Sequence, residues 1–423
     1  MENVLDIMRA RGLFDDCTNP DVGEKLAEPG VVYAGFDPSS NSLQAGNFVT
    51  IMALAHFQRC GHKVIALAGG ATGMIGDPSG KTSERTLLTQ EQVAANTEGI
   101  RENLSRFLDF DHPTVPAVIV NNNDWLGEFS FLDFLRDIGK HFRMGAMLGR
   151  ESVRARLASE SGMSFTEFSY ALLQAYDFLH LHDTAGCRFQ IGGSDQWGNI
   201  TAGIDLVRKL RGEEVYGITI PLVCDSAGQK FGKSEGNAVY LDARKTSPYD
   251  FYQFFFRTTD ADVARFLKIF TFLSLDAIAE LEAALKESPE QRAAQRKLAE
   301  EVTRAVHGDA GLNVALRASE VLFGGSIEGL SATDLAGIFA DVPSAELPRA
   351  EVAGATVIDV ATAAGLCQSK GAARRLVQSG GLYLNNVRVP DVEATVNPED
   401  LVDDAVAVLR SGKKNFHLVK VAG

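Results

Sequence analysis

The chain has 423 residues, with 41 basic and 55 acidic side chains and a formal net charge of −14. Hydrophobic residues make up 45% and charged residues 23%, a balance typical of a globular protein with a buried core. This composition excludes a disordered chain, a collagen-like repeat and a small disulfide scaffold. The acidic excess also excludes a bulk-cationic nucleic-acid coat, so any contact with RNA has to come from a local basic patch.

The five cysteines are far apart and form no C-x-x-C pair, which indicates reduced thiols and gives no metal-ligand spacing. No apolar run approaches the roughly 18 residues that span a bilayer, so we expect no membrane contact. The N-terminal stretch, Met1-Glu2-Asn3-Val4-Leu5-Asp6, lacks the basic residues of a signal or transit peptide. A cytoplasmic protein is therefore expected.

The first part of the chain alternates between β-rich and helical patterns. Residues 1–14 have the spacing of a short amphipathic helix. A strand is predicted at 31–36, followed by a loop, a helical pattern over 48–57 and a second strand at 63–68. Strand, helix and strand in this order form a βαβ unit, which implies a parallel sheet with helices on its faces.

Two later runs, 117–120 and 218–223, are also predicted to be strands. The residues between about 125 and 190 are mostly helical in pattern, and we interpret them as an insertion between two halves of one sheet. The fold class is therefore α/β, with a first domain over residues 1–245.

A second, helical domain is predicted over 246–325, because helical periodicity continues from 274 to about 323. Ser288-Pro289-Glu290-Gln291 has the pattern of a capping box with proline at the first helical position, and Gly308 is a predicted C-cap. Residues 326–353 are rich in Gly, Ser, Pro and acidic residues with weak periodicity, which predicts a linker.

The last part of the chain, 354–423, is predicted to be a small α+β domain. Two β-rich runs flank Asn385-Asn386, which predicts a hairpin with a two-residue turn that tolerates positive φ. Lys370, Arg374 and Arg375 lie close together on a predicted helix and form a small basic patch in an acidic protein.

Two loops that follow predicted strands have the composition of ligand-binding loops. The stretch from Tyr33 to Asn47 leads through Gly46 into a helix start, where free N–H groups and the helix dipole attract anions. A structural turn with a helix cap would look the same. In the segment from Gly69 to Pro78, glycines let a ligand approach the backbone and Asp77 could pair with an ammonium group, with a tight turn as the alternative.

Two further groups of polar residues are candidates for a site. Lys81 and Arg85, four residues apart, could meet phosphate or could simply be solvated. Tyr170, Gln174 and Asp177 fall on one helical face among apolar neighbours, which favours a pocket wall over an exposed face because buried polar groups need partners.

The segment Lys230-Phe231-Gly232-Lys233-Ser234 suits a mobile clamp on a polyphosphate, although a surface loop would also fit. It resembles the K-M-S-K-S signature of class I aminoacyl-tRNA synthetases, in the K-F-G-K-[ST] form of the bacterial-type tyrosyl branch. Residues 134–142, 165–170 and 192–199 are also similar to that branch, and residues 368–385 resemble an S4-type RNA-binding domain. The resemblance covers essentially the whole chain.

This resemblance implies a Rossmann-like catalytic domain with a helical insertion, a helical anticodon-side domain and an S4-like tail. The implied activity is that of a tyrosine–tRNA ligase, which forms tyrosyl-adenylate from L-tyrosine and ATP and transfers the tyrosyl group to tRNA-Tyr. ATP would be a substrate that carries Mg²⁺, without a metal cage in the protein. The implied assembly is a homodimer through the insertion.

The resemblance also implies roles for individual residues. Tyrosine would be bound by Tyr33, Asp77, Tyr170, Gln174, Asp177, Gln190 and Gln196. ATP would be bound by Gly35, Asp37, Ser39, Gly46, Asn47, Gly192, Asp195 and Lys233. Catalysis at the phosphates would involve Gln44, Asn47, Thr50, Lys81, Arg85, Lys230, Lys233 and Ser234. RNA would contact Lys370, Arg374 and Arg375.

One motif departs from the family's His-x-Gly-His signature, because the corresponding residues are Gln44-Ala45-Gly46-Asn47. Amides donate hydrogen bonds to phosphate but carry no charge, which predicts a lower adenylation rate. Two alternatives remain open: a catalytically weakened, synthetase-like RNA-binding protein, and a tryptophan-specific relative. A Tyr33–Asp177 pair suited to a phenol hydroxyl favours tyrosine, and the other pocket residues favour an enzyme.

Overall fold

The computed structural model describes residues 3–79, 88–159, 162–234, 237–339, 342–413 and 415–422. The chain divides into two compact units, Met1–Gly308 and Asp309–Gly423. The finer division expected from the sequence, with boundaries near residues 245, 325 and 353, stays a prediction.

A six-stranded sheet forms the centre of the first unit, in the order β1-β6-β5-β2-β3-β4. Its strands are β1 (Asp16–Cys17), β2 (Val31–Phe36), β3 (Lys63–Ala68), β4 (Val118–Asn121), β5 (Phe189–Gly193) and β6 (Tyr216–Ile220). β1 is antiparallel to β6, and all other neighbours are parallel. The predicted βαβ unit is confirmed, because α3 (Phe48–Arg59) connects β2 to its parallel neighbour β3.

The order of the strands reverses beside β2. The chain moves outward from β2 through β3 to β4, and then returns through the insertion to β5 on the other side of β2. At such a point the loops after neighbouring strands diverge, which leaves a crevice at the carboxyl ends of the strands. The polar loops that follow β2 and β5 therefore meet, although they are far apart in the sequence.

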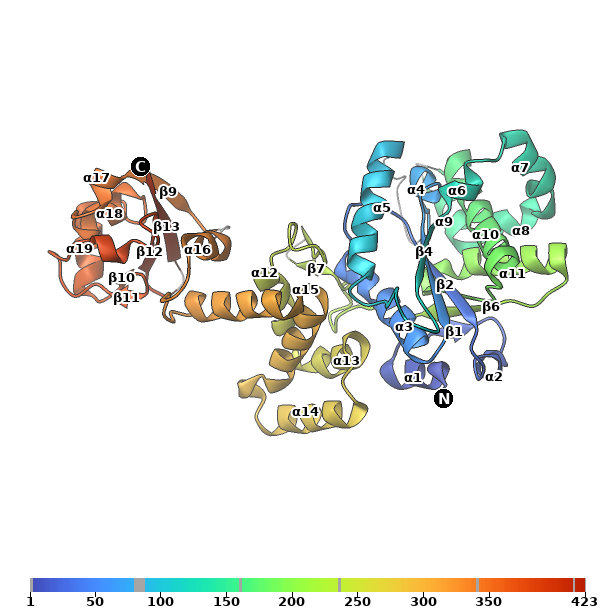
Figure 1. Ribbon diagram of the computed structural model, residues 1–423, viewed down its shortest axis with the longest axis horizontal. Coiled ribbons are helices and arrows are strands. Elements are labelled where there is room, and N and C mark those ends of the chain that lie inside the picture. The colour runs from blue at the N-terminus through green and yellow to red at the C-terminus, as the bar shows by residue number, and fades with distance from the viewer. Residues whose placement is uncertain are drawn as a thin grey trace. The chain divides into compact units, whose positions relative to one another are not determined.

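The helices of the sheet region lie around these strands (Figure 1). Before the insertion they are α1 (Val4–Arg11), α2 (Val22–Lys25), η1 (Ala45–Asn47), α3, α4 (Thr72–Ile75) and α5 (Gln90–Leu104). The insertion is helical, as expected, over its described residues: α6 (Asn123–Leu126), α7 (Phe131–Asp137), η2 (Gly139–His141), α8 (Met144–Leu148), α9 (Glu151–Leu157) and α10 (Phe165–Ala185). α10 packs against α11 (Trp197–Arg211) (Figure 1).

Caps define both ends of α10, the long helix that carries three of the candidate site residues. Ser164 Oγ accepts a hydrogen bond from Glu167 N at 3.2 Å, which satisfies a free N–H group of the first turn. The helix ends at Gly186, whose φ of 64° is typical of a left-handed C-terminal cap.

The rest of the first unit consists of a short hairpin and a helical region. Its elements are β7 (Lys233–Ser234), β8 (Asn237–Ala238), α12 (Pro248–Phe256), α13 (Asp260–Phe270), α14 (Leu275–Glu287), η4 (Pro289–Gln291) and the start of α15 (Ala293–Leu322). The predicted capping box is wrong: Ser288 makes no side-chain capping bond, and Arg292 with a φ of 50° ends the short turn. Gly308 breaks the helical geometry with φ 69° and ψ −179°, but α15 resumes beyond it.

The second unit contains a five-stranded sheet in the order β11-β10-β12-β13-β9. Its elements after α15 are α16 (Ala332–Ile338), β9 (Ser344–Pro348), α17 (Arg349–Val352), α18 (Val357–Ala363), α19 (Lys370–Gln378), β10 (Leu382–Leu384), β11 (Val387–Arg388), η5 (Pro398–Asp400), β12 (Val406–Ser411) and β13 (Asn415–Ala422). The predicted hairpin is confirmed, because Asn385 and Asn386 turn with φ of 50° and 64° between β10 and β11.

Residues 326–353, which are predicted to be a linker, contain α16, β9 and α17, and β9 pairs in parallel with β13 at the edge of the sheet. The pattern of a short edge strand is weak, and its partner lies far along the chain, so the sequence alone did not reveal it. None of the helices that the structure describes is long and apolar enough to cross a lipid bilayer.

Candidate active site

A cavity of about 280 Å³ lies at the carboxyl ends of β2 and β5. Thr50 and every predicted tyrosine or ATP residue with a described side chain line it: Tyr33, Gly35, Asp37, Ser39, Gly46, Asn47, Thr50, Asp77, Tyr170, Gln174, Asp177, Gln190, Gly192, Asp195 and Gln196. The structure thus brings these residues together at one cavity, while their individual roles stay predictions.

The most deeply buried polar part of the cavity wall consists of Tyr33, Asp177 and Gln190, which are 1%, 1% and 2% exposed. Trp125 Nε1 donates to Asp177 Oδ1 at 2.8 Å, and Asn122 Nδ2 donates to Asp177 Oδ2 at 3.0 Å. The Tyr33 hydroxyl and Gln190 Oε1 have no hydrogen-bond partner among the described residues. Buried polar atoms without partners mark a place where a ligand can supply the missing hydrogen bonds.

Burial decides the protonation of this pair. It raises the pKa of Asp177 to about 7, against the two donated hydrogen bonds, which lower it. Burial and then the charge of Asp177 raise the pKa of the Tyr33 hydroxyl well above its ordinary value, so that Tyr33 keeps its proton. Together the two side chains offer one donor and one acceptor to a hydroxyl group.

The other carboxylates make the cavity a site for a cation. Asp77 accepts hydrogen bonds from Ser79 N at 2.9 Å and from Gln196 Nε2 at 2.6 Å. The Tyr170 hydroxyl donates to Asp37 Oδ2 at 2.9 Å. The carboxylates of Asp37 and Asp77 therefore place negative charge in this part of the cavity, which favours an ammonium group.

A chain of hydrogen bonds links the carboxylate of Asp37 to that of Asp177. Thr72 Oγ1 donates to Asp37 Oδ1 at 3.0 Å, and Asn122 Nδ2 donates to Thr72 Oγ1 at 3.0 Å as well as to Asp177. Asn122 is fully buried at 0% exposure. This shared amide fixes the positions of Asp37 and Asp177 relative to one another, because a satisfied buried network is rigid.

The loop after β2 forms the side of the cavity predicted to bind ATP. Asn47 Oδ1 accepts from Gln44 N at 3.0 Å and closes the turn from which α3 starts. Gly46 and Asn47 line the cavity at this helix start, where an anion is favoured. Gln44 does not line the cavity and instead pairs through its backbone with Tyr240.

The segment Lys230–Ser234 is anchored by the aromatic side chain of Phe231. The Phe231 ring stacks on Phe270 with ring centroids 4.7 Å apart and contacts Phe266 at 4.9 Å. The next residue, Gly232, has a φ of 99°, and a Cβ atom there would lie 2.7 Å from Gly46 N. The glycines of the two signature segments are therefore in direct backbone contact.

The predicted phosphate-binding cations are only partly described. Lys230 is exposed, and its backbone forms a bridge to Cys224. Lys233 and Ser234 form β7, but their side chains lie outside the described part of the structure. Lys81 and Arg85 belong to residues 80–87, which also lie outside it.

Several site residues were missed by sequence reasoning. The cavity is also lined by Phe36, Leu67, Thr72, Ile191, Gly193 and Leu222. Asn122 and Trp125 donate hydrogen bonds to Asp177, and Asn199 donates to Asp77, from outside the cavity lining. One signal was available, since the polar run that includes Asn122 directly follows the predicted strand 117–120 and so lies at the carboxyl edge of the sheet.

In the second unit, α19 carries the three predicted RNA-binding residues on an exposed surface. Lys370, Arg374 and Arg375 are exposed, and Ser369 Oγ caps the helix by accepting from Ala372 N at 3.2 Å. Lys370 Nζ also lies 2.7 Å from Asp359, which leaves Arg374 and Arg375 as the more available cations.

Residues 25–324 match the family model of tRNA synthetases class I (W and Y), and residues 334–419 match that of the tyrosine–tRNA ligase SYY-like C-terminal domain. The tyrosine–tRNA ligase of Roseiflexus castenholzii is 51% identical, with 100% of both chains covered, and that of Opitutus terrae is 50% identical, with 99% of both covered. A C-terminally truncated mitochondrial tyrosyl-tRNA synthetase of Aspergillus nidulans is similar in structure, with a TM-score of 0.68, 32% identity and coverage of 76% of this chain and 95% of its own.

The parallel sheet and the cavity at its switch point thus have the form of a class I aminoacyl-tRNA synthetase. Within that class, the chain is about 50% identical over its full length to tyrosine–tRNA ligases, which identifies the tyrosyl branch. The chain belongs to the tyrosine–tRNA ligases.

Proposed function

We propose that the chain joins L-tyrosine to tRNA-Tyr in two steps at this cavity. A carboxylate oxygen of tyrosine attacks the α-phosphorus of ATP, and the bond to the leaving pyrophosphate breaks to give tyrosyl-adenylate. A hydroxyl of the terminal adenosine of tRNA-Tyr then attacks the tyrosyl carbonyl carbon, and AMP leaves. Both steps require positioned donors and cations rather than a covalent protein nucleophile.

The observation that carries this proposal is the buried pair Tyr33 and Asp177. A tyrosine hydroxyl between them would donate to the carboxylate and accept from the unpartnered Tyr33 hydroxyl. The α-ammonium group would then reach the acidic region of Asp77, with Tyr170 and Gln174 beside it. In that pose Gln190 and Gln196 would lie along the substrate, and the carboxylate would face the α3 start.

ATP would occupy the side of the cavity formed by Gly46 and Asn47, with Asp37, Ser39, Gly192 and Asp195 around its ribose and base. The N–H groups at the start of α3 would favour its phosphates. Lys81, Arg85, Lys230, Lys233 and Ser234 would stabilise the charge that grows on the leaving pyrophosphate. Mg²⁺ would be carried by the ATP; among the described residues no cluster of three or more His, Cys, Asp or Glu side chains could hold a metal ion.

The tryptophan-specific alternative fits the pocket less well. An indole N–H could donate to Asp177, but it would leave the Tyr33 hydroxyl without a partner, which costs free energy at a buried site. A tryptophanyl-tRNA synthetase of Plasmodium falciparum shares the fold with a TM-score of 0.53, but at 12% identity this similarity concerns the fold alone. The second alternative, an RNA-binding protein without activity, is not supported, because the similar relatives are ligases.

RNA binding is assigned to the second unit, through Lys370, Arg374 and Arg375. Their phosphate contacts would anchor tRNA-Tyr on a chain that is acidic overall. The five cysteines are free thiols, as is usual in a reducing compartment, and we infer that the chain works in the cytoplasm.

We further propose that the insertion forms a homodimer. Phe131, Leu132, Met144 and Phe165 are 65%, 75%, 58% and 66% exposed, beside an apolar cavity of about 470 Å³. Large exposed apolar patches mark protein contacts.

Sedimentation velocity tests whether this surface forms the dimer: Leu132→Lys should yield monomers, whereas the control Leu275→Lys on α14 should not. A Leu132→Lys variant that stays dimeric would contradict this choice of surface.

ATP–pyrophosphate exchange with tyrosine, phenylalanine and tryptophan side by side tests the function. Phenylalanine lacks the hydroxyl and would leave the Tyr33–Asp177 pair unsatisfied. The expected discrimination is about 10⁴ to 10⁵ in kcat/KM, a magnitude for which tyrosyl-tRNA synthetases are themselves the reference case. Comparable exchange rates with two of the amino acids would refute the assignment.

A further inference from the structure

Helix α5 lies along the back of the loop that follows β2. Asn96 Nδ2 donates to Pro38 O at 2.8 Å, and Asn103 Oδ1 accepts from Leu43 N at 2.8 Å and from Ser42 Oγ at 3.1 Å. Positions 96 and 103 are seven residues apart and lie on one face of a helix. Since Asp37, Ser39, Gly46 and Asn47 from this loop line the cavity, α5 supports the wall of the ATP side from outside.

The contact between α5 and the loop has no room for a side chain at its centre. Gly99, between the two asparagines on the same face, packs against Asn41. A Cβ atom at position 99 would lie 1.8 Å from Asn41 O and 2.7 Å from its carbonyl carbon. A helix backbone held this close to a loop backbone restricts where the loop can move.

The segment that follows the K-F-G-K-S signature pairs with the same loop. Val239 O accepts from Ala45 N at 2.8 Å, and Leu241 N donates to Leu43 O at 2.9 Å. Asp242 N donates to Ser42 Oγ at 3.1 Å, and Lys245 Nζ donates to Ser40 Oγ at 2.7 Å. Ser42 Oγ therefore connects the segment after the signature, through Asp242, to Asn103 on α5.

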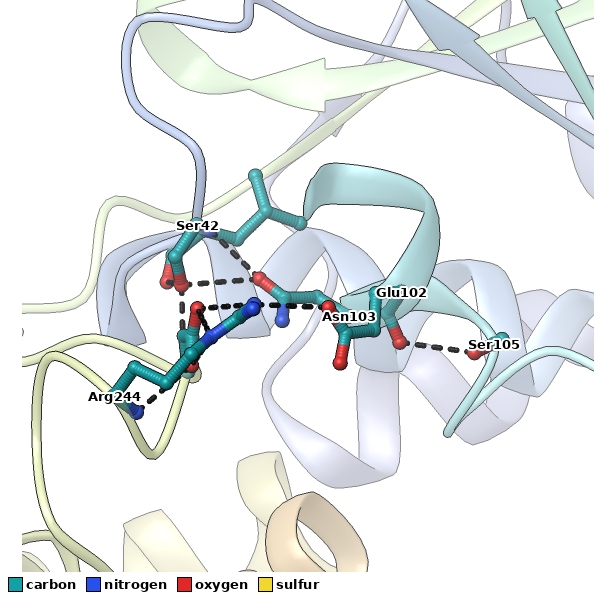
Figure 2. Close-up of polar contacts among 7 residues, drawn as sticks. Ser42, Glu102, Asn103, Ser105 and Arg244 are labelled. Atoms are coloured by element: carbon teal, nitrogen blue, oxygen red, sulfur yellow. Dashed lines mark hydrogen bonds and ion pairs between the residues drawn. The ribbon is translucent and has the colours of Figure 1, made fainter. Parts of the chain in front are cut away.

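Figure 2 shows this junction, with Asn103 facing Ser42 and Arg244 reaching across toward Glu102. Arg244 Nε donates to both carboxylate oxygens of Asp242 at 2.9 Å, and Arg244 contacts Glu102 at 3.0 Å. Ser42 and Asn103 are 3% and 4% exposed. The Arg244–Glu102 ion pair is exposed and contributes little, whereas the hydrogen bonds of Ser42 and Asn103 are protected from water.

We propose that Asn103 is a positioning residue for the adenylation step. Its side-chain oxygen holds the loop of Pro38–Leu43 and, through Ser42, the segment after the signature in one arrangement, so that the two phosphate-binding segments keep their relative position. It acts through these segments and does not touch a substrate. This inference rests on the proposed placement of ATP beside Gly46 and Asn47.

The test compares two buried amides of the first unit. Gln58, at 6% exposure, likewise holds a neighbouring segment, through Nε2 to Asp109 O at 2.6 Å and Val115 O at 3.0 Å and through Oε1 from Asp109 N at 2.9 Å, but it does not line the cavity or the loop. Asn103→Ala and Gln58→Ala therefore remove comparable buried hydrogen bonds, and both should lower the unfolding midpoint. Only Asn103→Ala should slow adenylation.

Stopped-flow adenylate formation and equilibrium tyrosine binding are measured for the parent and both variants. Asn103→Ala should lower the adenylation rate constant about 10- to 100-fold, since a displacement of about 1 Å can cost that much, with tyrosine affinity unchanged. Asn103→Asp keeps the accepting oxygen and should recover most of the rate, although a buried carboxylate is less stable. If the loss of rate only followed the loss of stability, Asn103→Asp would be as slow as Asn103→Ala or slower, which would contradict the proposal.

An Asn103→Ala variant with the parental rate constant would overturn the proposal, as would a Gln58→Ala variant that is slowed equally. In both cases the parent's tyrosine-dependent activity still supports the proposed function. A parent without tyrosine-dependent adenylation would refute the function itself, and the inference with it.

Discussion

Asp177 is a buried carboxyl group in the cavity wall, where burial disfavours its charged form and where a substrate hydroxyl can donate a hydrogen bond to it. Its pKa is raised to about 7 by burial, while the hydrogen bonds from Asn122 and Trp125 stabilise the charged form. A phenol that donates to the carboxylate would also favour the charged form, so tyrosine binding should release a proton below about pH 7 and should weaken as the pH falls.

The same group makes stability depend on pH. The folded chain holds this proton between the ordinary pKa of 3.8 and about 7, whereas the unfolded chain does not, so stability falls as pH rises through this window. Asp177→Asn removes the effect. The free energy of unfolding of this variant relative to the parent should rise between about pH 4 and pH 7.5, by at most about 4.5 kcal/mol, because one pKa unit corresponds to about 1.4 kcal/mol. Thermal unfolding across this range checks the prediction, and a constant difference would contradict it.

The two amides of the altered signature, Gln44-Ala45-Gly46-Asn47, differ in their position relative to the cavity. Asn47 lines the cavity and Gln44 does not. We therefore expect Asn47→His to raise the adenylation rate constant a few-fold at about pH 6, where imidazole is charged, and much less at about pH 8. The gain has to exceed the loss of the Asn47 turn bond to Gln44 N.

Single-turnover rates over this pH range test the expectation, with Gln44→His as the comparison. A larger effect of Gln44→His, or no effect of Asn47→His at either pH, would show that charge at this helix start does not limit the reaction.

At the residue scale, the sequence predicted contacts within one element better than contacts between elements. Helical spacing alone placed Tyr170, Gln174 and Asp177 on one face, and the structure brings all three to the cavity. Asn122 and Trp125 reach Asp177 from α6 and the turn before it, so their role depends on how β4 pairs with β3. Tertiary pairing of this kind has no local pattern in a single sequence.

At the scale of elements, a glycine–glycine contact sets the distance between the two signature segments. Gly232→Ala would place a Cβ atom 2.7 Å from Gly46 N and would force a side chain into a φ of 99°. Backbone atoms cannot move aside as a flexible side chain can. The segment should therefore shift, and the adenylation rate constant should fall by about 10²-fold or more.

The measurement is single-turnover adenylation by Gly232→Ala, with tyrosine affinity as the internal control. Gly228→Ala is the matched variant, because Gly228 also has a positive φ, of 79°, but no atom lies within 4 Å of a Cβ atom there. Equal rates in the two variants would mean that backbone strain, and not the contact with Gly46, is responsible.

Elements with strong periodicity were predicted and elements defined by distant pairing were not. The unit of β2, α3 and β3 follows from two apolar strands and an apolar helix face in sequence. β5 was not predicted as a strand, because it is short and ends in Gly192-Gly193, and only pairing with β2 and β6 defines it. β9 was missed for the same reason.

At the scale of the whole molecule, the division at Gly308 predicts separable activities. A chain that ends at Gly308 keeps the complete cavity and should activate tyrosine at the parental rate. It lacks α19 and should charge tRNA-Tyr poorly. A truncated chain that charges tRNA normally would refute RNA binding by the second unit.

Salt dependence provides a finer version of this test. Arg374→Ala with Arg375→Ala should raise the KM for tRNA and reduce the slope of log affinity against log salt by roughly 0.7 to 0.9 for each phosphate that is no longer neutralised. Arg349→Ala on α17 is the control, since this exposed arginine is paired with Asp404 at 2.9 Å. An unchanged slope in the double variant would place the RNA elsewhere.

Binding of tyrosyl-adenylate in the cavity, with its phenol between Tyr33 and Asp177, is tested by a crystal structure of the chain with a non-hydrolysable analogue of this intermediate. We expect the phenol hydroxyl to lie within hydrogen-bond distance of both Tyr33 and Asp177, the ammonium group to contact Asp77, and the adenosine to lie beside Gly46 and Asn47. An analogue bound with its phenol hydroxyl away from Tyr33 and Asp177, or outside the cavity, would contradict it.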